Sequence, residues 1–138
     1  MAYVMYIVKD KFYCPIEWRT NKIKRVVHNT LAAEAMALVK GCQDGIFYKK
    51  YLEKLIGINV RLKAWCDNKG LVSSISSTKQ VQDKLITLEV AGIKEYIQNG
   101  ELEEVEWIEG ANMLANCLTK HKADNSKLIK TFTHNIIE

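Results

Sequence analysis

The stretch LKAWCDNKG, residues 62–70, places an acid directly after an apolar segment. Residues 60–65 alternate or run apolar as a buried strand does, and Asp67 with Asn68 follows them, before a short helical segment predicted at 69–76. The end of a buried strand holds a side chain rigidly, as a binding or catalytic site requires. Asp67 is therefore the first candidate site residue.

The second candidate, Glu34, lies in TLAAEAMAL, residues 30–38. Apolar residues recur there at three- and four-residue steps and predict a long helix, from an N-cap at Thr30 to about residue 56, where Gly57 ends it. At about 100° per residue, Glu34 falls roughly 60° from the centre of the apolar stripe. We therefore expect this acid beside the core and not on the open face of the helix.

The remaining segments complete the order β-β-α-β-α-α-β-α. A hairpin is predicted at 3–8 and 12–18, with Pro15 marking an edge strand or a bulge. A helix is predicted at 79–98 and a strand at 105–108, followed by a helix from residue 111 and an amphipathic turn at 126–133. This order predicts one α/β domain over residues 1–138, with a mixed sheet flanked by helices.

Bulk properties restrict the class of protein. The 138 residues are 48% hydrophobic and 26% charged, without a long apolar run, which indicates a folded chain with no membrane partner. A net charge of +4 suits a polyanionic partner but is common in proteins that have none. The four cysteines lack metal-site spacing, so we expect reduced core residues. The first residues lack the pattern of a secretory signal, and an intracellular location, cytoplasm or nucleus, is expected.

Five segments together resemble the ribonuclease H domain of copia-type retrotransposons over nearly the whole chain. They are CPIEWRTNKIKRVV at 14–27, TLAAEAMAL at 30–38, WCDNKG at 65–70, STKQVQDK at 77–84 and WIEGANMLANCLTK at 107–120. The resemblance implies a ribonuclease H-like fold, Mg²⁺ or Mn²⁺ as cofactor and an RNA/DNA hybrid as substrate. It also implies Glu34 and Asp67 as the second and third metal-binding acids, and Asn116 as the position of the fourth.

Two departures from the family pattern bear on catalysis. The family's first strand, which carries the first acid, has no counterpart before the hairpin, and Asn116 brings an amide without charge. Two carboxylates in place of four leave too little charge to hold paired divalent ions, so we expect no tight metal binding. Asp10 and Asp83 are interpreted as surface acids. Without the resemblance, Asp67 as a helix cap and Glu34 as a solvated or capping acid would be the ordinary interpretation.

Basic residues suggest a nucleic-acid surface. Four of them cluster between the hairpin and the first helix and two flank the next predicted helix: Arg19, Lys22, Lys24, Arg25, Lys79 and Lys84. They could line a path for phosphates, or form an ordinary solvated basic face. The tryptophans Trp18, Trp65 and Trp107 are expected in the core. His121 is a further candidate, because the family sometimes uses a histidine near the last acid.

A sheet without its central strand leaves backbone groups unpaired on both neighbouring strands. The hairpin could close against the strand at 60–65, another protein could donate a strand, or two copies could join as a homodimer. We predict a rearranged or oligomeric sheet. The expected function is a retrotransposon-derived domain kept for interaction or structure without cleavage. Two alternatives stay open: a hybrid ribonuclease completed by a partner strand or an upstream segment, and a non-catalytic nucleic-acid-binding domain.

Overall fold

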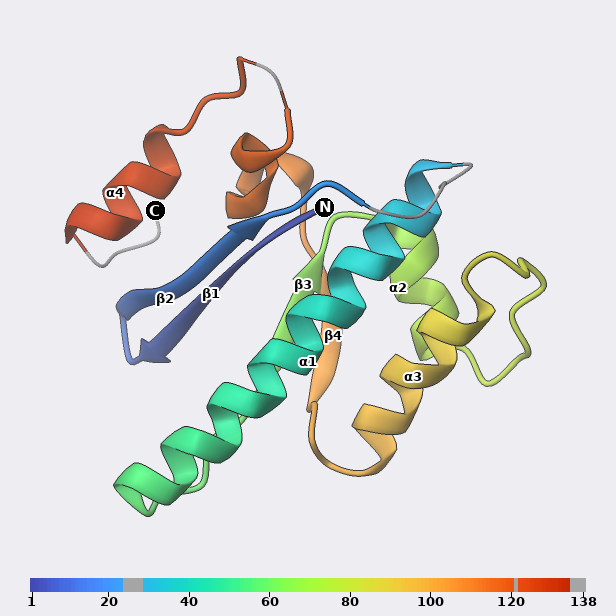
Figure 1. The fold of residues 1–138 in the computed structure, drawn as a ribbon, viewed down its shortest axis with the longest axis horizontal. Coiled ribbons are helices and arrows are strands. Elements are labelled where there is room, and N and C mark those ends of the chain that lie inside the picture. The colour runs from blue at the N-terminus through green and yellow to red at the C-terminus, as the bar shows by residue number, and fades with distance from the viewer. Residues whose placement is uncertain (24–28, 121, 135–138) are drawn as a thin grey trace.

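The computed structural model describes residues 1–23, 29–120 and 122–134, and its class is mixed α/β with two small sheets (Figure 1). The order of elements agrees with the predicted one up to the last strand, but two 3₁₀ turns stand where the helix from residue 111 was predicted. Their bounds are β1 Ala2–Lys9, β2 Phe12–Thr20, α1 Thr30–Ile56, β3 Lys63–Cys66, α2 Lys69–Ser76, α3 Thr87–Gln98, β4 Glu104–Trp107, the 3₁₀ turns η1 Gly110–Asn112 and η2 Leu114–Leu118, and α4 Ser126–His134.

Strands β1 and β2 form the predicted antiparallel hairpin. The register shifts between Met5, which pairs with Glu17, and Tyr6, which pairs with Pro15, so Ile16 is an extra residue in β2. This is the bulge that Pro15 predicted, because proline cannot donate to the ladder.

The ends of α1 follow from local side-chain chemistry. Its N-cap is Asn29 and not the predicted Thr30: the Asn29 side chain accepts a hydrogen bond from the Ala32 N–H at 2.8 Å. Asparagine satisfies a free helix N–H at least as well as threonine does, which explains the one-residue difference. The predicted end is confirmed, since Gly57 has a φ of 73° and its N–H donates to the Glu53 carbonyl.

One predicted helix begins later than expected and another is absent as an α-helix. The helix predicted at 79–98 begins only at Thr87, because Asp83 organises a turn before it: its side chain accepts from the Leu85 N–H at 2.9 Å and its carbonyl from the Thr87 hydroxyl at 2.8 Å. Such local hydrogen bonds compete with helix formation. The helix predicted from residue 111 is present only as the turns η1 and η2.

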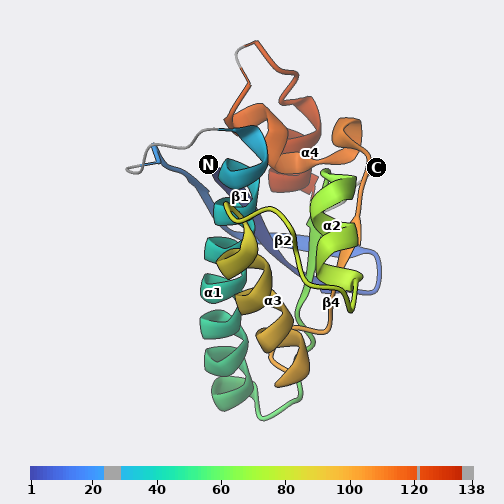
Figure 2. The ribbon, with the colours of Figure 1, turned by 90° about the vertical axis from the view of Figure 1, so that its right-hand side faces the viewer.

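The expected single mixed sheet is instead two separate pairs, β1–β2 antiparallel and β3–β4 parallel. The buried core lies among α1, α2, α3, β3 and β4, and among the described residues it includes none from the hairpin. Helices α1 and α3 lie side by side against β3–β4 (Figure 2), while α1 also contacts β1. The hairpin is therefore attached to the rest of the domain through α1, η2 and α4 rather than through a continuous sheet.

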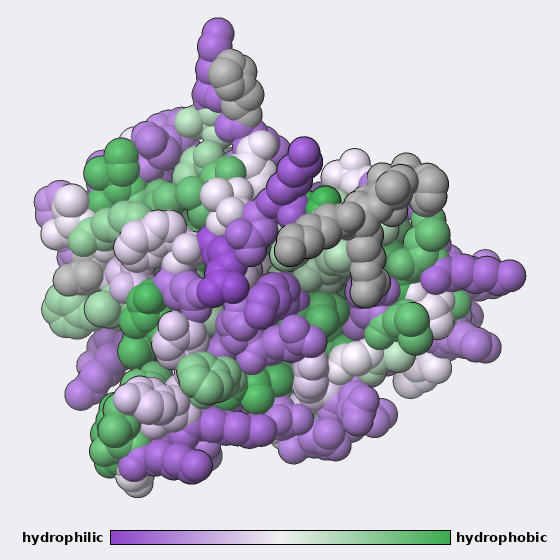
Figure 3. All heavy atoms as spheres, viewed as in Figure 1, coloured by the Kyte–Doolittle hydropathy of each residue, from purple (hydrophilic) through white to green (hydrophobic). Residues whose placement is uncertain are grey.

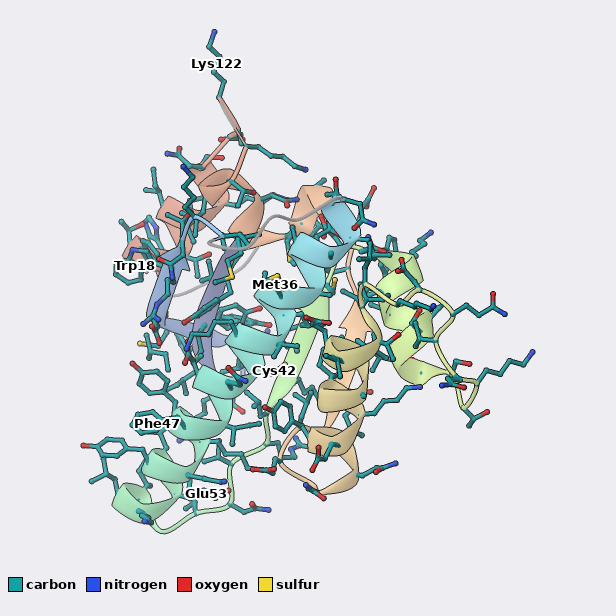
Figure 4. All side chains as sticks on the ribbon, turned by 45° about the vertical axis from the view of Figure 1, so that its right-hand side comes forward. Trp18, Met36, Cys42, Phe47, Glu53 and Lys122 are labelled. Atoms are coloured by element: carbon teal, nitrogen blue, oxygen red, sulfur yellow. The ribbon has the colours of Figure 1, made fainter. Side chains whose placement is uncertain are left out.

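Apolar side chains are also exposed. Those at the end of α1, including Phe47 and Leu55, are 66% and 65% exposed and give the green patch at the lower left of Figure 3. Trp18 and Trp107, which were predicted to lie in the core, are 55% and 43% exposed. Trp18 packs on Phe132 of α4, and Figure 4 shows it at the side of the molecule. In the described part of the chain, no helix combines the length and apolar character needed to cross a membrane.

Candidate site at the cavity between the two sheets

A cavity of about 700 Å³ lies between the two strand pairs. Its walls are β1, the first half of α1, β3, and the turns η1 and η2. Glu34, Asp67 and Asn116, which the sequence singled out, all line this one cavity. The tertiary structure thus gathers three side chains from separate segments at the carboxyl end of β3.

Asp67 directly follows β3, as predicted. Its backbone carbonyl accepts a hydrogen bond from the Trp107 indole N–H at 3.1 Å, which links the ends of β3 and β4. Within the described residues its carboxylate takes part in no hydrogen bond or ion pair. Asp67 is not the cap of α2, because Asn68 fills that role. The carboxylate is therefore free to meet a partner in the cavity.

Glu34 is held at the same end of the cavity by Asn68. The Asn68 amide donates to Glu34 Oε2 at 2.6 Å, while its Oδ1 accepts from the Leu71 N–H at 3.0 Å and caps α2. One asparagine thus fixes the start of α2 and the position of an acid on α1. In the sequence, Asn68 stands out only as the neighbour of Asp67. The signal for it was present, since asparagine ahead of an apolar helical segment is a strong N-cap.

Asn116 lies in η2 and its side-chain amide donates to the Gly110 carbonyl in η1. A Cβ added to Gly110 would lie 3.4 Å from Asn116 Nδ2 and 3.4 Å from Asp67 Oδ2, so both side chains flank this glycine. Gly110 was not singled out by the sequence. A carboxylate could not make the hydrogen bond that the Asn116 amide makes, because an ionised acid only accepts.

The residues present do not fit the paired divalent ions that the resemblance implies. Carboxylate and amide oxygens are ligands that Mg²⁺ accepts, but two carboxylates give little charge, and Glu34 already accepts a hydrogen bond from Asn68. The described residues contain no group of three histidine, cysteine, aspartate or glutamate side chains that could hold a metal. Neither Asp10 nor Asp83 lines the cavity, so neither replaces a missing acid there.

Burial sets the state of other groups that line the cavity. Burial raises the pKa of the Cys66 thiol, and the nearby carboxylates of Asp67 and Glu34 raise it further. Burial raises the pKa of Tyr6 to about 12, with a contribution from Tyr13. Tyr6 of β1 stacks on Trp65 of β3, with ring centroids 6.2 Å apart and planes 15° from parallel. These groups are uncharged at neutral pH and make the middle of the cavity apolar.

The basic residues do not form one surface in the described part of the chain. Arg19 pairs with Glu17 at 2.8 Å and lies 3.9 Å from Asp44, so its charge is partly neutralised. Lys79 and Lys84 are exposed in the loop between α2 and α3, on the opposite side of α1 from β2 (Figure 1). Lys22 is exposed, and Lys24, Arg25 and His121 lie outside the described residues. Binding of nucleic acid stays a prediction, testable by the salt dependence of binding to an RNA/DNA hybrid.

Comparison of the chain with protein-family profiles, with curated proteins and with solved structures gives no match. The site therefore has to be interpreted from its own residues.

Proposed function

We propose that this chain is a retrotransposon-derived ribonuclease H-like domain that serves as an interaction module and does not cleave nucleic acid on its own. Two findings support this proposal. The hairpin, the helix that carries Glu34 and the strand that ends before Asp67 come in the order that the sequence predicted, and Glu34, Asp67 and Asn116 line one cavity. An intracellular setting is part of the proposal.

The observation that carries the loss of cleavage is the hydrogen bond from Asn116 to the Gly110 carbonyl. In this position the amide is a structural donor between two turns, a role that an ionised acid cannot take over. Phosphodiester cleavage with two metals needs several carboxylates to hold both ions against their hydration. Of the described residues that line the cavity, Glu34 and Asp67 are the two that supply such charge.

The direct test is a cleavage assay on a labelled RNA/DNA hybrid in Mg²⁺ and in Mn²⁺. We expect the chain to release no more product than its Asp67→Asn variant does. Robust cleavage that Asp67→Asn abolishes would overturn the proposal. Cleavage that appears only in Asn116→Asp would agree with a non-cleaving parent and would show that the single charge lost at Asn116 is the whole defect.

A second candidate function is a hybrid ribonuclease that needs a strand from elsewhere. It is favoured by the position of Glu34, Asp67 and Asn116 beside β1 and β3, whose facing edges carry no strand pairing among the described residues. A strand placed there could bring a further acid to the site. The assay for this candidate is cleavage by the chain together with an extended peptide that carries an aspartate, in Mg²⁺, with a serine-carrying peptide as control.

A further inference from the structure

The two strands that border the cavity each have an open edge. In the described residues β1 pairs only with β2, and β3 pairs only with β4. The opposite edges of β1 and β3 both line the cavity, through residues 1–6 and 62–66. An open strand edge presents a row of N–H and C=O groups that require partners when they are shielded from water.

The floor of the cavity is the face of α1 that carries small side chains. Ala33, Ala37 and Gly41 line the cavity at four-residue steps, which places them in one row along the helix. Tyr3 of β1 already lies over Gly41, with its ring 3.5 Å from where a Cβ of that glycine would stand, so the space for side chains of another segment lies above Ala33 and Ala37. The floor is therefore suited to receive one face of an extended chain.

The opposite face of the cavity is closed by the stack of Tyr6 on Trp65. Side chains alternate along a strand, and Tyr3 of β1 faces α1, where its hydroxyl donates to Asp44. Tyr6 consequently points to the face away from α1. Cys66 is buried in the core with α1, so Trp65 also points away from it. The two rings form a cover over the gap between β1 and β3.

We infer that this cavity accepts an extended segment of a partner polypeptide, which pairs with the open edges of β1 and β3 together. The inference rests on the proposed interaction role and names the partner's chemistry. Figure 1 shows β1 running opposite to β3, so a segment between them is antiparallel to one strand and parallel to the other. The segment we infer is antiparallel to β1 and parallel to β3. Residues 1–6 of one wall and 62–66 of the other line the cavity, which corresponds to a segment of about six residues, or about 20 Å at the rise of a strand.

The segment is apolar on the face toward α1 and carries a lysine or arginine at its carboxyl end. Because it runs parallel to β3, its carboxyl end lies beside Glu34 and Asp67. Those two carboxylates border the cavity, and the carboxylate of Asp67 makes no hydrogen bond or ion pair within the described residues. The amine of Lys63 is already paired with Glu104 at 2.6 Å, and Lys120 at the same end is exposed to solvent. A cationic side chain from the segment neutralises the two acids.

The test uses a six-residue peptide that alternates valine with threonine and ends in lysine, with a soluble glycine-serine tag before it. Binding to the whole chain is measured by calorimetry, and backbone protection by hydrogen exchange. We expect saturable binding that slows exchange in both 1–8 and 62–66, because both edges gain partners. Protection of one segment alone, or no binding, would overturn the inference.

Two phenylalanine substitutions distinguish a loss of peptide binding caused by filling the cavity from one caused by adding a large side chain to any helix. Ala37→Phe places a ring on the floor, and we expect at least about a tenfold loss of affinity, equivalent to ~1.4 kcal/mol. Ala91→Phe makes the same change at an exposed position of α3 and should bind as the parent does. If Ala37→Phe fails to fold, Tyr6→Ala decides the matter. It removes the cover and should bind the peptide at least as tightly as the parent does, whereas a loss of binding would contradict the proposed path.

The charge assignment has its own test. Replacing the terminal lysine by glutamate should weaken binding about fivefold, as expected for a partly exposed ion pair, and the difference should vanish in the variant Glu34→Gln with Asp67→Asn. A peptide ending in aspartate that binds best, and only with Mg²⁺, would overturn the cationic assignment and favour the completed nuclease. Dimers in light scattering that Ala37→Phe dissociates would instead identify a second copy as the occupant.

Failure of this inference and failure of the proposed function are separable. If the peptide does not bind and the chain does not cleave the hybrid, the proposed function stands and only the inference of a strand-accepting cavity is refuted. If the chain alone cleaves a hybrid, the proposed function is refuted, whether or not the peptide binds. Binding of a small apolar dye that the peptide does not displace would assign the cavity to a small ligand and overturn the inference.

Discussion

Asp67 and Asn116 both lie beside Gly110, each with a side-chain atom 3.4 Å from the place where a Cβ of that residue would stand. Their side-chain atoms are thus no more than twice that distance apart. Asn116 turns its amide to the Gly110 carbonyl. An acid in place of Asn116 would therefore face both a carbonyl oxygen and the Asp67 carboxylate, which are two acceptors.

The first prediction concerns the stability of Asn116→Asp at neutral pH. The variant loses a partly buried hydrogen bond and gains repulsion between oxygens, so its free energy of unfolding should fall by roughly 1 to 3 kcal/mol. Urea unfolding followed by circular dichroism measures this. Asn112→Asp is the matched control, because Asn112 Oδ1 accepts from Lys127 at 2.9 Å and a carboxylate keeps that bond. Equal losses in the two variants would contradict the structural role of Asn116.

The second prediction is the pH dependence of the same variant. The introduced carboxyl is disfavoured as an anion in the folded state, so we expect a raised pKa. When protonated it can donate to the Gly110 carbonyl. A raised folded-state pKa gives stability that is present at low pH and is lost as the pH rises through that pKa. The difference in free energy of unfolding between variant and parent should therefore shrink below about pH 4. Urea unfolding of both proteins at a series of pH values measures it. A constant difference would refute this account.

The third prediction concerns Asn68, which caps α2 and also holds Glu34. Asn68→Ala should lower the free energy of unfolding by about 2 kcal/mol, because a helix cap and a charge-assisted hydrogen bond are lost together. Asn29→Ala removes only the cap of α1 and should cost about 1 kcal/mol. In a double-mutant cycle with Glu34→Gln, the cost of Asn68→Ala should change, whereas that of Asn29→Ala should not.

The fourth prediction uses the contact between the hairpin and α1. Asp44 accepts from the Tyr3 hydroxyl and from Lys40 at 2.7 Å. Burial acts to raise the pKa of Asp44, but the hydrogen bonds from Lys40 and Tyr3 outweigh it and hold the pKa below the ordinary value of 3.8. A lowered pKa gives stability that is present above 3.8 and is lost as the pH falls through the folded-state value.

Asp44→Asn should therefore be less stable than the parent at pH 7, and the difference should shrink as the pH falls below the ordinary pKa and vanish below the folded-state pKa of Asp44. Urea midpoints across the pH range measure it. Asp10→Asn is the control, because Asp10 sits in the exposed turn at a φ of 54° that asparagine also adopts. If Asp44→Asn is still less stable than the parent in acid, the charge of Asp44 is not the cause of the difference in stability.

The fifth prediction concerns the thiols. Burial raises the pKa of Cys42 to about 12 and also raises that of Cys66, while Cys14 is exposed. Since the thiolate is the reactive form, iodoacetamide at pH 8 should modify Cys14 first and should reach Cys42 and Cys66 only in urea. Mass spectrometry of tryptic peptides gives the rates. Native Cys66 that reacts as fast as Cys14 would show that solvent enters the cavity freely.

The local features could be predicted from the sequence because neighbouring residues decide them. The hairpin and its bulge follow from alternation and Pro15, and the end of α1 follows from Gly57. The position of Asp67 after β3 follows from an apolar run that stops at an acid. Prediction failed at 79–86 and at 111–120, where polar side chains make local hydrogen bonds that a periodic pattern does not reveal.

The sequence by itself determined which short-range elements form and which acids are present, because helix caps, turns and strands depend on contacts within a few residues. Only the tertiary structure decided that Asp67 and Asn116 flank Gly110, that Asn68 holds Glu34, and that the two strand pairs stand apart with a cavity between them. These relations join segments far apart in the chain. They depend on how α1 packs across both pairs of strands, and no local pattern carries that information.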